Sequence, residues 1–277
     1  MDALPRAVRW SPAVAVARRD RAVVALESSV LAQGLPIPAN READHRMRLA
    51  VVAHGAVPAV VALVRGEATI GLEGEDLERF LRRDGVIKVS ARDLGWAAAR
   101  GLDGATTVAA TLELCTVAGL EVVATGGIGG VHREPAYDES ADLLELSRSP
   151  VITVCAGAKS ILDLPATLER LESYGVAVIG FGTDEFPGFL SRGTGLRLAA
   201  FTDDPAEIAR AFRAHRRLGG NRRAGHHAVP AGGRRARDGR CITAGQPRAP
   251  RVECRARRPH RRRLPGGRVA PGWCGAR

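Results

Sequence analysis

Short aliphatic runs alternate with amphipathic helical patterns through the first 220 residues, and this alternation restricts the fold more than any other feature. Six runs have the length and composition of buried strands, at residues 22–27, 59–64, 86–89, 121–125, 151–155 and 176–181. Six helices are expected at residues 40–54, 73–83, 106–118, 140–147, 165–174 and 205–216. Continuous Val/Ile/Ala strands separated by helices are typical of parallel sheets covered on both faces. The sequence therefore predicts an α/β fold with three layers, α/β/α, around a largely parallel central sheet.

The composition is that of a globular protein of one large domain or two small ones. Hydrophobic residues make up 45% of the 277 residues, which is enough for a substantial core. No run of 18 apolar residues occurs and the N-terminus has no signal-peptide pattern, so we expect a cytoplasmic protein that does not bind membranes. The five cysteines form no CxxC pair and no zinc-site spacing.

The net charge of +11 is unevenly distributed. Residues 1–220 carry a net charge of −3, whereas residues 221–277, here called the C-terminal tail, carry 16 Arg against Asp238 and Glu253. In the tail, 31 of 57 positions are Arg, Gly or Pro, and only five are aliphatic. Such a segment cannot bury enough apolar area to offset its ordering entropy, so the tail is predicted to be disordered.

Lysine is almost absent from the chain, which has 39 Arg but only Lys88 and Lys159. Arginine stays protonated and cannot act as a nucleophile, whereas a lysine amine can form a Schiff base with a sugar carbonyl. The two lysines are either remnants of a compositional bias or residues that arginine cannot replace. Both lie at or just after predicted strands, as does Glu27, and ligands of parallel sheets gather at the carboxyl ends of strands.

Two further segments are candidate anion sites. The glycine-rich run at residues 126–130, flanked by Thr125 and His132, permits close backbone approach to a single phosphate. It does not match a dinucleotide fingerprint or a P-loop, so a single phosphate is the favoured ligand. The alternative is a tight turn that needs positive φ. Residues 104–108 offer a second anion cradle, because two threonines, Thr106 and Thr107, open a predicted helix just before Val108.

Acidic residues follow the glycine run. Asp138 lies in a loop, and one such carboxylate with several waters would suit Mn²⁺ or Mg²⁺. Ser140 and Asp142 either belong to the same site or cap the helix that follows.

Together these segments resemble the pseudouridine-5′-phosphate glycosidase family, also called indigoidine synthase A-like. The matching stretches are VVALESS (23–29), AVPAVVAL (56–63), KVSARDL (88–94), GATTVAAT (104–111), ATGGIGGVHR (124–133), DESADL (138–143) and CAGAKSILDLPAT (155–167). They occur in family order, and the resemblance as a whole covers residues 10–220. The resemblance implies reversible cleavage of pseudouridine 5′-phosphate to uracil and ribose 5-phosphate, in an α/β/α homotrimer.

The resemblance also implies residue roles. Lys159 stands at the position of the covalent lysine, Glu27 at that of the proton donor and Asp138 at that of the manganese ligand. The substrate-binding positions correspond to Lys88, Val108, Ser140, Ala141 and Asp142, with Thr107 and His132 near the same pocket. Lys88 can neutralise the phosphate or, as a neighbouring like charge, activate Lys159.

The tail does not resemble the family. The family's later Thr-Pro-Phe segment and its late asparagine are not recognisable after residue 220, so residues 1–220 are predicted to be a catalytic domain without its C-terminal part. We interpret the tail as a frameshift product of GC-rich DNA. Three alternatives to an active glycosidase stay open: an inactive family member, a Schiff-base aldolase acting on another sugar phosphate, and a nucleic-acid-binding protein acting through the +14 tail. No specific nucleic-acid partner is expected.

Overall fold

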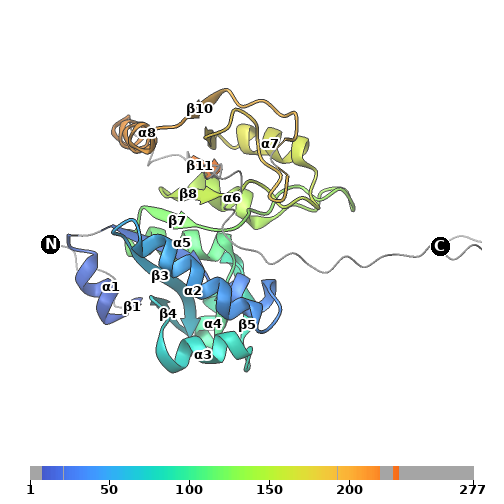
Figure 1. Cartoon of the computed structure of the whole chain (residues 1–277). Coiled ribbons are helices and arrows are strands. Elements are labelled where there is room, and N and C mark those ends of the chain that lie inside the picture. Colours follow the sequence, from blue (N-terminus) through green and yellow to red (C-terminus); the bar gives the residue numbers. More distant parts are fainter. Residues whose placement is uncertain (1–7, 21, 192, 219–226, 231–277) are drawn as a thin grey trace, which may run out of the picture. The chain divides into compact units, whose positions relative to one another are not determined.

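The computed structural model describes residues 8–20, 22–191, 193–218 and 227–230. Within these residues no helix has both the length and the apolar character needed to cross a membrane. The strands are β1 (Val8–Trp10), β2 (Val23–Glu27), β3 (Val57–Val64), β4 (Glu67–Ile70), β5 (Ile87–Val89), β6 (Gly104–Thr106), β7 (Val122–Ala124), β8 (Ile152–Cys155), β9 (Ala177–Phe181), β10 (Ala200–Thr202) and β11 (His227–Pro230) (Figure 1).

Helices occupy most of the connections between these strands (Figure 1). They are α1 (Pro12–Ala17), α2 (Ala39–Val52), α3 (Gly74–Arg82), α4 (Leu94–Ala99), α5 (Val108–Ala118), α6 (Ala141–Arg148), α7 (Leu164–Ser173) and α8 (Pro205–Arg217), with the π-helix η1 (Val30–Gly34) and the 3₁₀-helix η2 (Ala91–Asp93).

The sheet is mostly parallel, with the order β1-β4-β3-β2-β7-β8-β11-β9-β10. Among the named strands, antiparallel pairing involves β3, which pairs in that sense with β4 and β6, while β5 joins β6 in parallel. The register places Leu26 of β2 beside Ala124 of β7, and Ala124 beside Val154 of β8. The carboxyl ends of β2, β7 and β8 therefore lie next to one another at one edge of the sheet.

Both faces of the central strands are buried, as a covered parallel sheet requires. In β3, Val61 packs in the larger hydrophobic cluster, which includes residues of α1, α5, α6 and α7. Its neighbour Val60 points to the opposite face, into a second cluster with Leu72 and Phe80. The alternation of side chains along a strand thus feeds two separate cores, and the predicted α/β fold with a mostly parallel central sheet is confirmed.

The sequence located all six strands and all six helices that it predicted, with shifts of a few residues at their ends. It missed the short elements β1, α1, β4, α4, β6 and β10. Strands of three or four residues carry too little periodicity to stand out from a loop. Tertiary pairing, such as that of Val8 with Ala68, stabilises them instead.

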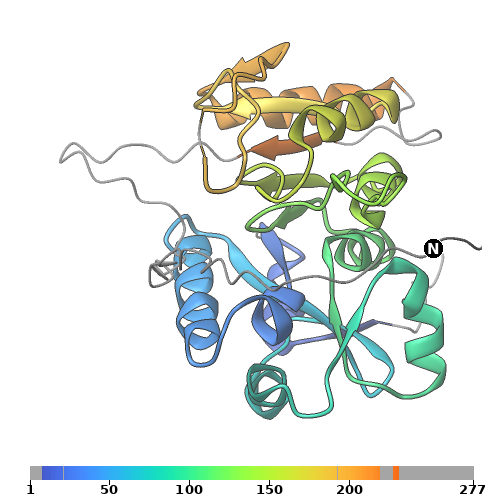
Figure 2. The ribbon, with the colours of Figure 1, turned by 90° about the vertical axis from the view of Figure 1, so that its right-hand side faces the viewer.

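One described stretch of the C-terminal tail departs from the predicted disorder. Residues His227–Pro230 form β11, which pairs in parallel with β8 on one side and β9 on the other (Figure 2). Main-chain pairing with two neighbouring strands orders this segment, a contribution that composition alone does not report. The rest of the predicted tail lies outside the described residues.

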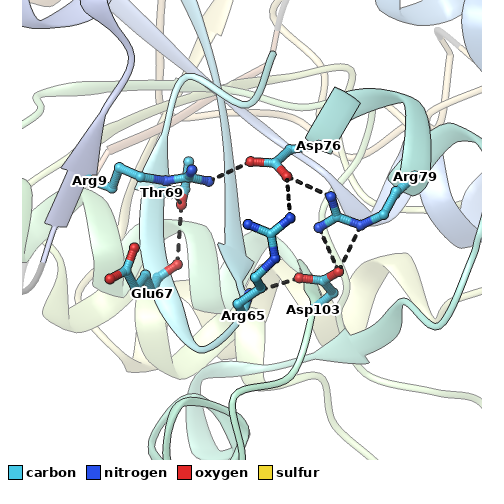
Figure 3. A network of polar contacts seen from close by, with 7 residues as sticks. All are labelled: Arg9, Arg65, Glu67, Thr69, Asp76, Arg79 and Asp103. Carbon is cyan, nitrogen blue, oxygen red and sulfur yellow. Dashed lines mark hydrogen bonds and ion pairs between the residues drawn. The ribbon is translucent and has the colours of Figure 1, made fainter. Parts of the chain in front are cut away.

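A network of charged side chains ties β1, α3 and the ends of β4 and β6 together (Figure 3). Asp76 of α3 accepts hydrogen bonds from Arg9 at 2.8 Å and from Arg79 at 2.6 Å. Arg79 also donates to Asp103 at 2.7 Å, and the backbone N–H of Arg65 donates to the other carboxylate oxygen of Asp103. This network lies on the surface of the fold and has a structural role.

Candidate active site

Three of the predicted site residues, Glu27, Lys88 and Lys159, line one cavity of about 380 Å³. The remaining lining residues are Ser29, Val30, Gln33, Gly34, Gly126, Gly127, Ser160, Ile161, Phe189 and Leu190. Two cavities of similar volume, about 390 and 420 Å³, lie around Glu121 and Val122 at the amino end of β7. Neither contains a predicted site residue, so the chemistry points to the first cavity.

The carboxyl ends of adjacent strands supply most of this cavity. Glu27 ends β2, the glycine run follows β7, and Lys159 lies four residues beyond the end of β8. The Lys159 segment pairs with the glycine run, because the Lys159 N–H donates to the Ile128 carbonyl at 3.1 Å and the Ile128 N–H donates to Gly157 at 3.0 Å. Residues at and after the carboxyl ends of β2, β7 and β8 thus lie together, as parallel pairing of these strands requires.

Lys88 reaches the cavity by a different route. Strand β5 is parallel to β6, and β6 is antiparallel to β3, so β5 runs against the direction of β2 and β7. Lys88 is an exposed residue of this short strand. Lys88 of β5 and Lys159 of the segment after β8 thus line one cavity together with Glu27.

Glu27 is the buried acid of the cavity, with 9% of the residue exposed. Burial raises the pKa of its carboxyl group, because desolvation disfavours the carboxylate. Hydrogen bonds from Ser29, at 2.7 Å, and from Thr125, together with the charge of Lys159, act in the opposite direction but do not cancel the effect. The result is a carboxyl group biased towards its protonated form, as a general acid requires.

A buried hydroxyl cluster fixes the strand end that carries Glu27. Ser28 Oγ and Thr106 Oγ1 both donate to the Val61 carbonyl at 2.7 Å, and Ser28 accepts from the Thr106 N–H at 2.8 Å. Thr111 donates to Thr106 at 2.9 Å. These bonds join β2, β3, β6 and α5 directly behind the acid, so Glu27 stands on a rigid support.

The glycine run binds the Asp142 carboxylate through its backbone, so part of the predicted anion cradle is already occupied by a side chain of the protein. Asp142, buried with 5% exposed, accepts from the N–H of Gly129 at 2.8 Å and of Ala109 at 2.9 Å. A Cβ on Gly129 would lie 2.2 Å from Ser140 Oγ. The predicted alternative, a tight turn, would need positive φ, and none of Gly126, Gly127, Gly129 and Gly130 has a positive φ. Glycine is required at position 129 by the close approach of Ser140 instead.

Four other predicted substrate-binding residues lie at the starts of α5 and α6. Thr107 caps α5, accepting from the Ala110 N–H at 3.4 Å, and Val108 is buried. Ser140 caps α6, accepting from the Asp142 N–H at 3.2 Å, and the exposed Ala141 begins that helix. Within the described part of the chain, none of these residues is among those lining the cavity.

Asp138, the predicted metal ligand, lies next to His132, which was predicted to lie near the substrate. Their side chains approach to 3.1 Å between Nδ1 and Oδ2, and both are partly exposed. Among the described residues no cluster of three His, Cys, Asp or Glu side chains is present. A single carboxylate beside an imidazole suits a hard divalent cation that keeps most of its water, and it does not suit a fully protein-coordinated ion.

Ser29, Gln33 and Phe189 also line the cavity and had no predicted role. Ser29 follows Glu27 within a motif, so its contact with the acid was accessible from the sequence. Phe189 was not, because it comes from a loop far along the chain that carries no motif of its own.

Comparison with known proteins agrees with this geometry. The model of the family described as indigoidine synthase A like protein matches residues 13–244, which extends beyond the predicted limit at residue 220. A pseudouridine-5′-phosphate glycosidase of Gemmatimonas aurantiaca is 71% identical over 201 residues, which are 73% of this chain and 66% of that protein. The corresponding protein of Herpetosiphon aurantiacus is 54% identical over 200 residues, 72% of this chain and 66% of the relative. The chain thus spans just under two thirds of the length of these relatives.

Solved structures show the same fold. The prealnumycin C-glycosynthase AlnA, crystallised with ribulose 5-phosphate, is 38% identical with a TM-score of 0.74, over 81% of this chain and 73% of its own. An indigoidine synthase A-like protein from Thermotoga maritima is 33% identical with a TM-score of 0.74, over 80% of this chain and 73% of its own. With the family model matching most of its length, the chain belongs to the indigoidine synthase A-like family.

Proposed function

We propose that this chain cleaves the C–C glycosidic bond of pseudouridine 5′-phosphate reversibly, giving uracil and ribose 5-phosphate. The observation that carries the proposal is the convergence of Glu27, Lys88 and Lys159 on one cavity. Support comes from relatives named as glycosidases of this substrate and from a related structure that contains a pentose phosphate.

The substrate explains why an amine is needed. Its bond joins C1′ of ribose to C5 of uracil, so no leaving oxygen or nitrogen can be protonated, and a mechanism with two carboxylates has no suitable leaving group. A lysine provides another route through a covalent intermediate. Of the two lysines in the chain, Lys159 lies beside the glycine run and acts on Glu27 through its charge.

In the proposed reaction, Nζ of Lys159 bonds to C1′ while the C1′–O4′ ring bond opens and O4′ takes a proton. The nitrogen lone pair then forms a C=N bond as the C1′–C5 bond breaks, and its electrons pass to uracil C5. Glu27 delivers a proton to C5. Water hydrolyses the imine, which releases ribose 5-phosphate and restores the lysine amine.

Lys88 is proposed to bind the phosphate. Its exposed ammonium group faces the same cavity, and a point charge is well suited to a phosphate monoester. The glycine run contributes less than its composition suggests, because the N–H groups of Ile128 and Gly129 are already bonded to Gly157 and Asp142.

A divalent cation, Mn²⁺ or Mg²⁺, is proposed at Asp138, with His132 beside it. When bound, such an ion supplies positive charge that orders water and substrate oxygens. The homotrimer implied by the family resemblance is likewise a proposal, which sedimentation of the purified chain would test.

The direct test is release of uracil from pseudouridine 5′-phosphate by the purified 277-residue protein with Mn²⁺, followed by chromatography. We expect release by the wild type and none by Lys159→Arg, a variant that keeps the positive charge but cannot form an imine. Equal release by both proteins would reject the role of Lys159. Cleavage of other sugar phosphates without uracil release would favour the aldolase alternative.

A further inference from the structure

Phe189 lies at the tip of a turn that forms one side of the cavity, and its backbone φ is +54°. Left-handed backbone is uncommon for residues other than glycine, and it clusters at functional sites when the surroundings hold it in place. Here the Phe189 N–H donates to the Ala156 carbonyl at 3.0 Å, and Ser160 Oγ donates to the Gly188 carbonyl at 2.6 Å. The turn is therefore fastened on both sides to the segment that carries Lys159.

The Phe189 ring packs against the backbone of the glycine run. A Cβ on Gly127 would lie 2.8 Å from Phe189 Cδ2, and a Cβ on Gly126 would lie 3.2 Å from Cε2. Any side chain at Gly127 would displace the ring. The two glycines thus allow an aromatic ring to approach closely. This approach explains why glycine occupies both positions, independently of phosphate binding.

Phe189 is only partly buried, and its ring is the one aromatic surface among the described residues that line the cavity. Ile161 and Leu190 line the same cavity and are 73% and 76% exposed. The cavity therefore has an apolar side, formed by these three residues, in addition to the polar side that contains Glu27, Lys88 and Lys159.

We propose that Phe189 is the platform on which the uracil ring stacks. This inference rests on the proposed function, in which Glu27 protonates C5 of uracil but no residue is assigned to bind the ring of the base. Lys88 is matched to the phosphate and Lys159 to the sugar, whereas a flat heterocycle is bound most readily by a flat aromatic face. Phe189 is thus a positioning residue that holds C5 of uracil within reach of Glu27.

The test uses Phe189→Leu, which keeps an apolar side chain but removes the ring, and Phe189→Tyr, which keeps the ring. In the synthetic direction, from uracil and ribose 5-phosphate, we expect the KM for uracil to rise about tenfold in Phe189→Leu and to return towards wild type in Phe189→Tyr. The KM for ribose 5-phosphate should stay unchanged. Borohydride trapping of ribose 5-phosphate on Lys159 should also be unchanged, because that step does not involve the base.

Uracil binding, measured by ligand-observed NMR with ribose 5-phosphate present, separates this inference from the proposed function. Ring-dependent binding in a protein that releases no uracil from pseudouridine 5′-phosphate would support the platform and reject the proposed activity. Two results would overturn the platform: wild-type uracil affinity in Phe189→Leu, or loss of the ribose 5-phosphate adduct in step with uracil affinity. The second result would mean that the ring only supports the local structure.

Discussion

Replacing Asp142 by alanine should weaken the fold and disconnect the glycine run from α5. Its carboxylate accepts from two backbone N–H groups, of Gly129 at 2.8 Å and of Ala109 at 2.9 Å, and only 5% of the residue is exposed. A buried donor left without an acceptor costs about 1–3 kcal/mol, so the pair predicts a loss of about 2–6 kcal/mol in the free energy of unfolding. Domains of ordinary stability have about 5–15 kcal/mol in total.

The measurement is urea unfolding of both proteins followed by circular dichroism. Asp163→Ala is the matched control, because Asp163 caps α7 and accepts a single side-chain hydrogen bond, from the Ala166 N–H at 3.0 Å. Its loss should cost about 1 kcal/mol. Asp142→Ala could instead lose no more stability than Asp163→Ala while substrate affinity collapsed. Asp142 would then be a direct substrate ligand, and its proposed role in holding the glycine run to α5 would be wrong.

Two further predictions concern ionisation. Burial raises the pKa of Glu27 and the hydrogen bond from Thr125 opposes that rise, so Thr125→Val should raise the pKa further. Because the acid must be protonated to act, the alkaline limb of the kcat/KM profile should move to higher pH in this variant. An unmoved limb in Thr125→Val, or the same displacement in Thr125→Ser, would contradict this role of the hydrogen bond. Burial opposes ionisation of Asp76 too, but the charges and hydrogen bonds of Arg79 and Arg9 outweigh burial and lower the pKa of Asp76. The stability that Asp76 contributes is therefore fully present above the pKa of the unfolded state, about 3.9, and is lost as pH falls through the lower pKa of the folded state. Urea unfolding should therefore show Asp76→Asn less stable than wild type at pH 7, with the difference shrinking in strong acid, and a pH-independent difference would exclude this cause.

Much of the site was accessible from the sequence because its residues follow strands. Glu27 and Lys159 come at or just after long Val/Ile-rich runs, and parallel strands bring their carboxyl ends together. The scarcity of lysine then drew attention to the two amines that share the cavity. These inferences needed only local patterns and one general rule of sheet topology.

What the sequence did not reveal depends on contacts between distant segments. Phe189 meets the glycine run through a turn more than sixty residues further along the chain, and no periodicity encodes that approach. The direction of β5, which delivers Lys88, depends on antiparallel pairing of β6 with β3. An aspartate at position 142 can either bind substrate or accept hydrogen bonds from the backbone, and the sequence is the same in both cases. Only the hydrogen bonds seen in the structure distinguish the two roles.

Reduction with borohydride in the presence of ribose 5-phosphate, followed by peptide mapping, shows directly whether Lys159 forms the covalent intermediate. The chain offers its own control, because Lys88 is the only other lysine and lies in the same cavity. We expect an adduct on the peptide that contains Lys159 and none on the peptide that contains Lys88. An adduct on Lys88, or no adduct on either lysine, would contradict it.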